Sequence, residues 1–300
     1  MIQSKCRVLL CSLCLMMIVW APALASAMEA TSQHKAALSK TGKKAKMSEQ
    51  KLNQLDDELF SAVDDNDRVG VIRALSAGAA LNAEDRAGMT PLMHAALRGE
   101  KGLVRLLLAR NADVDTKDIF GVTALMQAAW AGHTDIVALL TSHAANVNIQ
   151  SSEVTPRLRA SGVSALMGAC MNGNLEVVKF LIAKRALINQ QDTQGQTALM
   201  YAAQKGDAQI VDLLLSKRAN LETKDQFGRT ALTIATIYDR YNIACMLISA
   251  GANVYTKDIH NMTPIVYSSA LDYGDLYKLL KTAMRQQYNR ATAQSFQLAP

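Results

Sequence analysis

The chain repeats itself every 33 residues, and this period limits the folds open to it more than any other feature. Similar stretches, each opening with an aspartate, begin at Asp85, Asp118, Asp192, Asp225 and Asp258. The longer interval between Asp118 and Asp192 holds two units and eight further residues. A unit of this length buries its apolar face only against its neighbours. The sequence therefore predicts an elongated stack of similar units.

Each unit contains the residue pattern typical of a turn followed by two helices. In the unit from Asp85, Gly88 permits the left-handed backbone of a turn, Thr90 can cap a helix, and Pro91 suits the first helical position. A second apolar stripe follows at 103, 104, 107 and 108, one face of another helix. We therefore expect a helix-turn-helix unit with a projecting turn.

The run T-P-L-M-H-A-A at 90–96 resembles the T-P-L-H-x-A signature of ankyrin repeats, and the resemblance extends over residues 52–285. It implies an all-α solenoid of helix-turn-helix units with β-turn tips, comprising about five full repeats and a degenerate N-terminal unit. Asn261 replaces the turn glycine in the last unit, where Asn is the next-best residue. The expected boundaries are 52–84, 85–117, 118–150, an insertion at 151–158, then 159–191, 192–224, 225–257 and 258–290.

The histidine of the family signature is replaced by methionine in four units. These residues are Met93, Met126, Met167 and Met200, whereas His94 stands one place later. We therefore expect the imidazole that links turns in this family to be absent. Thioethers can bind Cu(I), but units about 8–10 Å apart place the sulfurs too far apart to share an ion. Core filling is the favoured interpretation, with no metal and no cofactor; a metal-handling or enzyme-accessory protein is the alternative.

Residues 1–27 have the pattern of a secretory signal peptide. Lys5 and Arg7 precede an apolar run, Pro22 interrupts it, and Ala25-Ser26-Ala27 provides a cleavage site. We expect an exported, periplasmic protein. The alternative is a membrane-anchored scaffold, because residues 8–25 are long enough to span a bilayer if they are retained.

The basic charge is concentrated near the N-terminus. The net charge is +6, and residues 1–51 account for all of it. We expect 28–51 to be a Lys-rich disordered linker, with a weak contact to an anionic surface as an alternative role. Residues 291–300 are expected to be a frayed tail, following a last unit (258–290) whose Lys278, Lys281 and Arg285 suit a polar cap. The neutral remainder gives no support for nucleic-acid binding.

Features of an enzyme are weak. The five histidines are scattered, and motifs such as H-E-x-x-H, G-x-S-x-G or G-x-G-x-x-G do not occur. The repeated aspartates stand 33 residues apart or more, which suits turn bracing better than a convergent acid–base pair. We expect a non-catalytic protein.

The ankyrin resemblance implies that turn tips and first-helix ends bind a protein partner. Large apolar or arginine side chains at these places are the candidates. They are Met89, Arg98, Ile119, Phe120, Trp130, Met171, Phe227, Arg229, Ile237 and Tyr238. For the Phe and Trp residues, packing on adjacent units is the alternative. The expected state is a monomer that binds an unidentified protein.

The eight-residue insertion 151–158 interrupts the array at a turn tip. Pro156 excludes a continuous helix there, and Arg159 stands where the other units open with Asp. Because function concentrates on such loops, the insertion is either a tolerated longer loop or a partner-specific finger.

Overall fold

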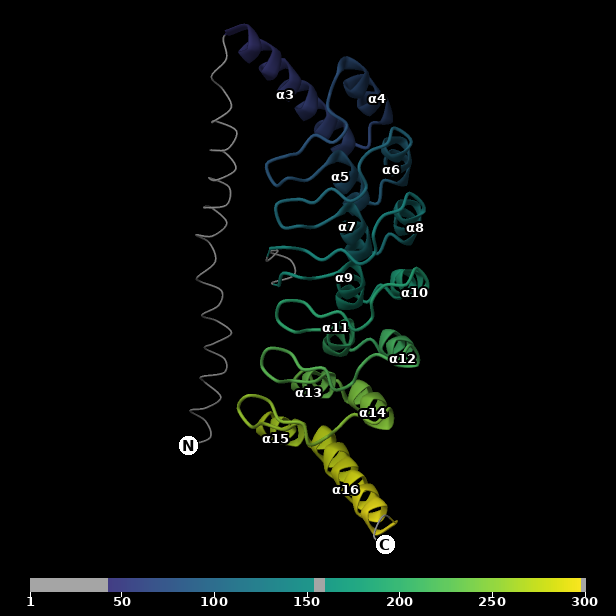
Figure 1. Cartoon of the computed structure of the whole chain (residues 1–300), viewed down its shortest axis with the longest axis vertical. Helices are drawn as coiled ribbons and strands as arrows, with labels where there is room; N and C mark the ends of the chain where they lie inside the picture. Colours follow the sequence, from purple (N-terminus) through teal and green to yellow (C-terminus); the bar gives the residue numbers. More distant parts are fainter. Residues whose placement is uncertain (1–42, 154–159, 298–300) are drawn as a thin grey trace.

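The computed structural model describes residues 43–153 and 160–297. The expected signal peptide and residues 28–42 of the expected linker lie outside the described residues. Within them the chain forms seven helix pairs stacked in sequence order (Figure 1). The first helices are α3 (Lys43–Asp64), α5 (Pro91–Arg98), α7 (Ala124–Ala131), α9 (Ala165–Asn172), α11 (Ala198–Lys205), α13 (Ala231–Ile237) and α15 (Pro264–Ala270). The second helices are α4 (Arg68–Ala77), α6 (Lys101–Leu108), α8 (Thr134–Ser142), α10 (Leu175–Ala183), α12 (Ala208–Ser216), α14 (Tyr241–Ser249) and α16 (Gly274–Gln297).

The first and second helices form two layers, and the turn tips project from the first-helix side (Figure 1). Thr123 shows why each first helix begins where it does, because its side chain accepts a hydrogen bond from the Met126 amide. The turn before it needs Gly121, whose φ is +76° and where an added Cβ would collide with Ser152. Asn261 adopts the same left-handed conformation with φ of 57°, as the sequence predicts. The all-α solenoid is confirmed.

The core runs without a break along the stack. The methionines at 93, 126, 167 and 200 are all buried between first helices, which confirms their expected core position. The equivalent residue of the last unit, Val266, is 41% exposed because no further unit covers it. Tyr277 of α16 is likewise partly exposed at a place where earlier units bury valine or alanine. The last unit therefore exposes apolar side chains at places that earlier units bury.

A ladder of polar side chains joins consecutive units on the second-helix side. The Asn148 carboxamide oxygen accepts from the Leu187 amide at 2.9 Å, and the Asn189 oxygen accepts from the Asn220 amide at 2.8 Å. The same bond is made by Asn82, Asp115 and Glu222. These bonds satisfy backbone donors between helix and turn, so the spacing of units is held by hydrogen bonds as well as by apolar packing.

Both ends of the array are more helical than predicted. Residues 43–51, expected in the disordered linker, belong to α3, whose later part buries Leu59 and Val63. Residues 291–297, expected in a frayed tail, belong to α16. This helix replaces the missing turn: Gln287 bonds to Ala252 and Val254, and the Tyr255 hydroxyl donates to the Met284 carbonyl at 2.7 Å. These tertiary bonds allow α16 to continue where the repeat pattern stops.

Candidate partner-binding surface

An aspartate braces the base of each tip. One carboxylate oxygen of Asp118 accepts hydrogen bonds from the amides of Phe120 and Val122, at 2.9 and 2.8 Å. The same pair of bonds is made by Asp85, Asp192, Asp225 and Asp258. Two charge-assisted bonds from one oxygen hold the turn closed. The expected role of these aspartates in bracing turns is confirmed.

The second oxygen of the aspartate is bound by a side chain from the first helix. The Tyr201 hydroxyl donates to Asp192 at 2.6 Å, and Nε2 of His94 lies 3.0 Å from Asp85. Tyr267 bonds to Asp258 in the same way. The expected absence of the turn-linking imidazole was therefore wrong in the unit from Asp85, where His94 makes the link. The link comes from the same helix position in each case, by histidine after Met93, by tyrosine after Met200 and by tyrosine after Val266.

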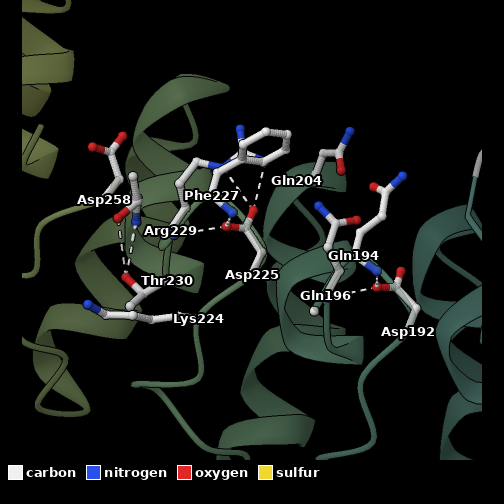
Figure 2. Close-up of polar contacts among 12 residues, drawn as sticks. Asp192, Gln194, Gln196, Gln204, Lys224, Asp225, Phe227, Arg229, Thr230 and Asp258 are labelled. Carbon is white, nitrogen blue, oxygen red and sulfur yellow. Dashed lines mark hydrogen bonds and ion pairs between the residues drawn. The ribbon is translucent and has the colours of Figure 1, made fainter. Parts of the chain in front are cut away.

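Arginine replaces the tyrosine in the unit from Asp225. Ile234 occupies the place of Tyr201, and Arg229 instead reaches Asp225 through Nε at 2.8 Å and Nη2 at 2.7 Å (Figure 2). The Arg229 guanidinium also lies 4.6 Å from the ring centre of Phe227. This stacking places two predicted partner-binding residues together on one tip, with the arginine fork held by a buried carboxylate.

Tyr238 lies at the end of the first helix in the same unit. It is 45% exposed, and its hydroxyl accepts a hydrogen bond from Gln204 of the preceding unit at 3.0 Å. Nε of Arg240 donates to the Gln204 carbonyl at 3.1 Å, so both parts of this glutamine are engaged. Ile237 is half-buried beside Tyr238. The phenol ring is thus held at the surface in a defined position.

Trp130 packs against the next unit and is only partly exposed to solvent. Its ring lies over Gly168 of the next unit, where an added Cβ would be 3.6 Å from the ring. Its carbonyl accepts bonds from Asn172 at 2.7 Å and Asn174 at 2.9 Å. The structure therefore shows the packing of Trp130 on the neighbouring helix, the alternative considered for this residue, although the residue as a whole is only half-buried.

The other predicted residues differ in accessibility. Met89, Phe120 and Met171 are half-buried against the core, and Ile119 is half-buried at its tip. Arg98 is exposed and pairs with Asp64 at 3.1 Å. The ten residues lie at tips and first-helix ends of successive units, and Phe227 and Arg229 are in direct contact. Gln204 occupies a helix-end position that the family resemblance also implies, but its bond to Tyr238 in the next unit does not follow from the sequence.

The enlarged tip opens at Ser151. The Ser151 hydroxyl accepts from the Val163 amide at 3.0 Å, as the aspartates do elsewhere, and its own amide donates to the Val163 carbonyl. Ser152 donates to the Phe120 carbonyl, the bond that joins each tip to the preceding one. Ser151 therefore occupies the position expected for Arg159, which lies outside the described residues. In chain order, the added residues therefore follow the bracing residue and do not precede it.

Burial raises the pKa of the Asp192 carboxyl despite the hydrogen bonds of Tyr201, Gln194 and Gln196. A raised pKa in the folded state contributes stability that is present below about pH 4 and lost as pH rises through the folded value. Asp192→Asn should therefore gain stability relative to the natural chain between pH 4 and 7. Urea unfolding at several pH values measures this change.

Asp135 provides a control of opposite sign. Burial alone would raise the pKa of this carboxyl, but the hydrogen bond and charge of Lys101, together with the backbone amides of Ile136 and Asp135, outweigh it and lower the pKa. Asp135→Asn should lose stability relative to the natural chain as pH rises through the acidic range. Parallel slopes for the two variants would contradict the assignment.

The stacked helix pairs, braced tips and continuous core define a helical-repeat solenoid. A family model described as ankyrin repeats matches residues 59–151 and 159–258, and the chain belongs to this family. Ankyrin repeats are generally protein-interaction modules and typically non-catalytic. No curated protein matches the chain. Among the described residues, no helix has both the length and the apolarity needed to cross a membrane.

Proposed function

We propose that this protein is a non-catalytic scaffold of the cell envelope, which binds a partner protein along its tips and first-helix ends. The observation that carries this proposal is the arrangement of Phe227, Arg229 and Tyr238. These residues belong to types that dominate interface energies, and hydrogen bonds hold Arg229 and Tyr238 in place at the surface. Little side-chain entropy would be lost when a partner covers them.

The rest of the line extends this surface. Trp130, Met171 and Phe120 present partly covered apolar area, and Arg98 and Met89 lie at the N-terminal end. The interface would be long and shallow, since each unit contributes a tip and a helix end. A monomer binding one unidentified protein is the state that we propose.

The envelope location is supported by the sequence of residues 1–27. The mass of the purified protein tests it, and a mature chain beginning at Met28 is the expected result. A mass that includes Met1 would replace the periplasmic assignment with an anchored one through residues 8–25.

The binding surface is tested by Tyr238→Ala and Phe227→Ala. We first capture the partner with the full chain and identify it by mass spectrometry. Each substitution should then weaken its binding at least about 30-fold, because residues of this kind contribute about 2 kcal/mol or more to an interface.

Tyr288→Ala is the matched control, since Tyr288 is 63% exposed on α16, outside the line of tips. It should leave the affinity unchanged. Unchanged binding by the Tyr238 and Phe227 variants, with the helical circular-dichroism spectrum intact, would reject the surface.

A further inference from the structure

The ends of the second helices carry exposed cations that the partner-binding surface does not use. Lys184 and Arg185 follow α10, and Lys217 and Arg218 follow α12; we call these four residues the basic edge. Arg110, just beyond α6, is the equivalent cation two units earlier, and the unit between has His143 and Ala144 at these places. Within the part of the chain that the structure describes, none of the five forms an ion pair. The edge therefore presents unpaired charge to solvent.

The two arginines stand where the backbone favours glycine. Arg185 and Arg218 have φ of 64° and 60°, in the left-handed region. Gly78 and Gly251 hold the equivalent place in other units, with φ of 109° and 99°. A side chain in this region is strained, and such strain is concentrated at functional sites. The structure of the turn alone does not require arginine at either position.

Helix capping accounts for only part of the pattern. Cations near a helix C-terminus interact favourably with the helix dipole, which suits Lys184 and Lys217 as C-cap residues. Asn111 and Ala144 occupy the left-handed position in two further units, so the turn accepts uncharged residues there. Lys184 and Lys217 already provide the favourable positive charge at the helix C-termini. The adjacent arginines therefore need another explanation.

The acids near the basic edge do not neutralise it. Glu222 is directed to the next unit, where its carboxylate accepts from the Asn253 amide at 2.8 Å and from Thr256 at 3.3 Å. Asp212 is exposed on α12, without a salt bridge to Lys217 or Arg218. The unit of Lys184 and Arg185 contributes Glu176, which pairs with Lys179 near the start of α10. Four cations thus stand against two acids, Asp212 and Glu222, neither of which forms an ion pair with them.

The edge lies in the layer of second helices, which the first helices separate from the tips (Figure 1). Adjacent second helices are about 8–10 Å apart, so the charges form a row on a convex side. Phe180 is half-buried and covered by Lys184 at 5.5 Å, so it offers no free face for stacking a base. Long cationic side chains on a convex row fit a flat anionic surface better than a nucleic-acid strand.

We propose that the basic edge docks the solenoid on an anionic lipid surface, with the tips directed away from it. The lysines between residues 28 and 51 remain after the expected cleavage, and they add positive charge that favours an anionic surface. This inference concerns a different face from the partner-binding surface and does not depend on it.

The first experiment measures binding of the full chain to vesicles of phosphatidylglycerol and phosphatidylcholine, and to vesicles of phosphatidylcholine alone. Each arginine removed should weaken binding to the anionic vesicles about fivefold, so R185G/R218G should lose about 25-fold. R185K/R218K should bind nearly as the natural chain. The matched control R73Q/R285Q removes the same charge from exposed sites elsewhere and should change binding less than twofold.

Urea unfolding of the same variant shows whether weaker vesicle binding results from lost docking or from lost folding. Because glycine relieves the left-handed strain, R185G/R218G should unfold at a higher urea concentration than the natural chain. Weaker vesicle binding by a more stable protein supports the proposal. A variant that binds as well as the natural chain, or a control that loses as much, would overturn it.

A second readout does not depend on how residues 1–27 interact with lipid. Phenylglyoxal modifies exposed arginines, and mass spectrometry locates them. Anionic vesicles should protect Arg185 and Arg218 while Arg73 and Arg285 stay reactive. Equal protection by phosphatidylcholine vesicles, or stronger protection by duplex DNA at matched charge, would refute lipid docking.

Discussion

Replacing Met167 with alanine is expected to lower the free energy of unfolding by about 2–5 kcal/mol. Met167 is 1% exposed on α9, which packs between α7 and α11. Truncation removes buried apolar atoms and leaves a cavity in the centre of the array, where neither neighbouring unit can collapse without disturbing its own contacts. Urea unfolding followed by circular dichroism measures the loss.

Val266→Ala is the control at the same place in the last unit. Because Val266 is 41% exposed and covered on one side only, its truncation should cost less than about 1 kcal/mol. Equal losses for the two variants would show that the methionines do not stabilise the stack through burial between units. A minor loss for Met167→Ala would lead to the same conclusion.

Asp225→Ala is expected to cost about 2–4 kcal/mol and to disorder the tip that carries Phe227. The Asp225 side chain is 1% exposed, and its removal leaves the Phe227 and Arg229 amides and the Arg229 guanidinium without their acceptor. Because Arg229 is 24% exposed, water can recover part of its solvation, which limits the loss. Affinity for the captured partner should fall in parallel.

Asp225→Asn compares the contributions to stability of the two carboxylate oxygens, one bound by backbone amides and the other by Arg229. Asparagine can keep the oxygen that accepts from the two amides while losing the charge bound by Arg229, so it should lose less stability than alanine. Asp135→Ala, which breaks an exposed pair with Lys101, should cost less than about 1 kcal/mol. If Asp225→Ala were as mild as this exposed control, the brace could not be what holds the tip.

The helices within the units were predictable from local chemistry. Thr90 and Thr123 cap their helices, and Pro91 begins α5, because these preferences depend on a few adjacent backbone groups. The ends of the array were not predictable in this way. In α3 the buried residues Leu59 and Val63 lie in the later turns, and the lysine-rich sequence at its start has no apolar periodicity to reveal a helix.

The link to the bracing aspartate was hidden by its chemical variety. His94, Tyr201 and Arg229 make the same contact from two different sequence positions, so no single residue type repeats every 33 residues. Because only histidine at one position was considered, the contact to the aspartate was predicted to be missing. In the structure the contact is present but is made by other residues or from a neighbouring position. Similarly, Ser151 opens the enlarged tip with a hydroxyl in place of a carboxylate.

The candidate surface was predictable as a set of positions but not as an arrangement. Tip and helix-end positions follow from the repeat, which identifies Phe227, Trp130 and Tyr238. Whether each side chain is available depends on the neighbouring unit: Gly168 receives the Trp130 ring, whereas Gln204 holds Tyr238 at the surface.

The sequence by itself determined the period, the unit and the stack, because turns, caps and apolar stripes act over a few residues and recur. Only the tertiary structure decided which side chains complete each brace, where the enlarged tip begins, and how far the terminal helices extend. Those outcomes depend on contacts between residues one unit or more apart, which repetition brings together but local sequence does not specify. The strained arginines of the basic edge also became evident only when the backbone angles of equivalent turns could be compared.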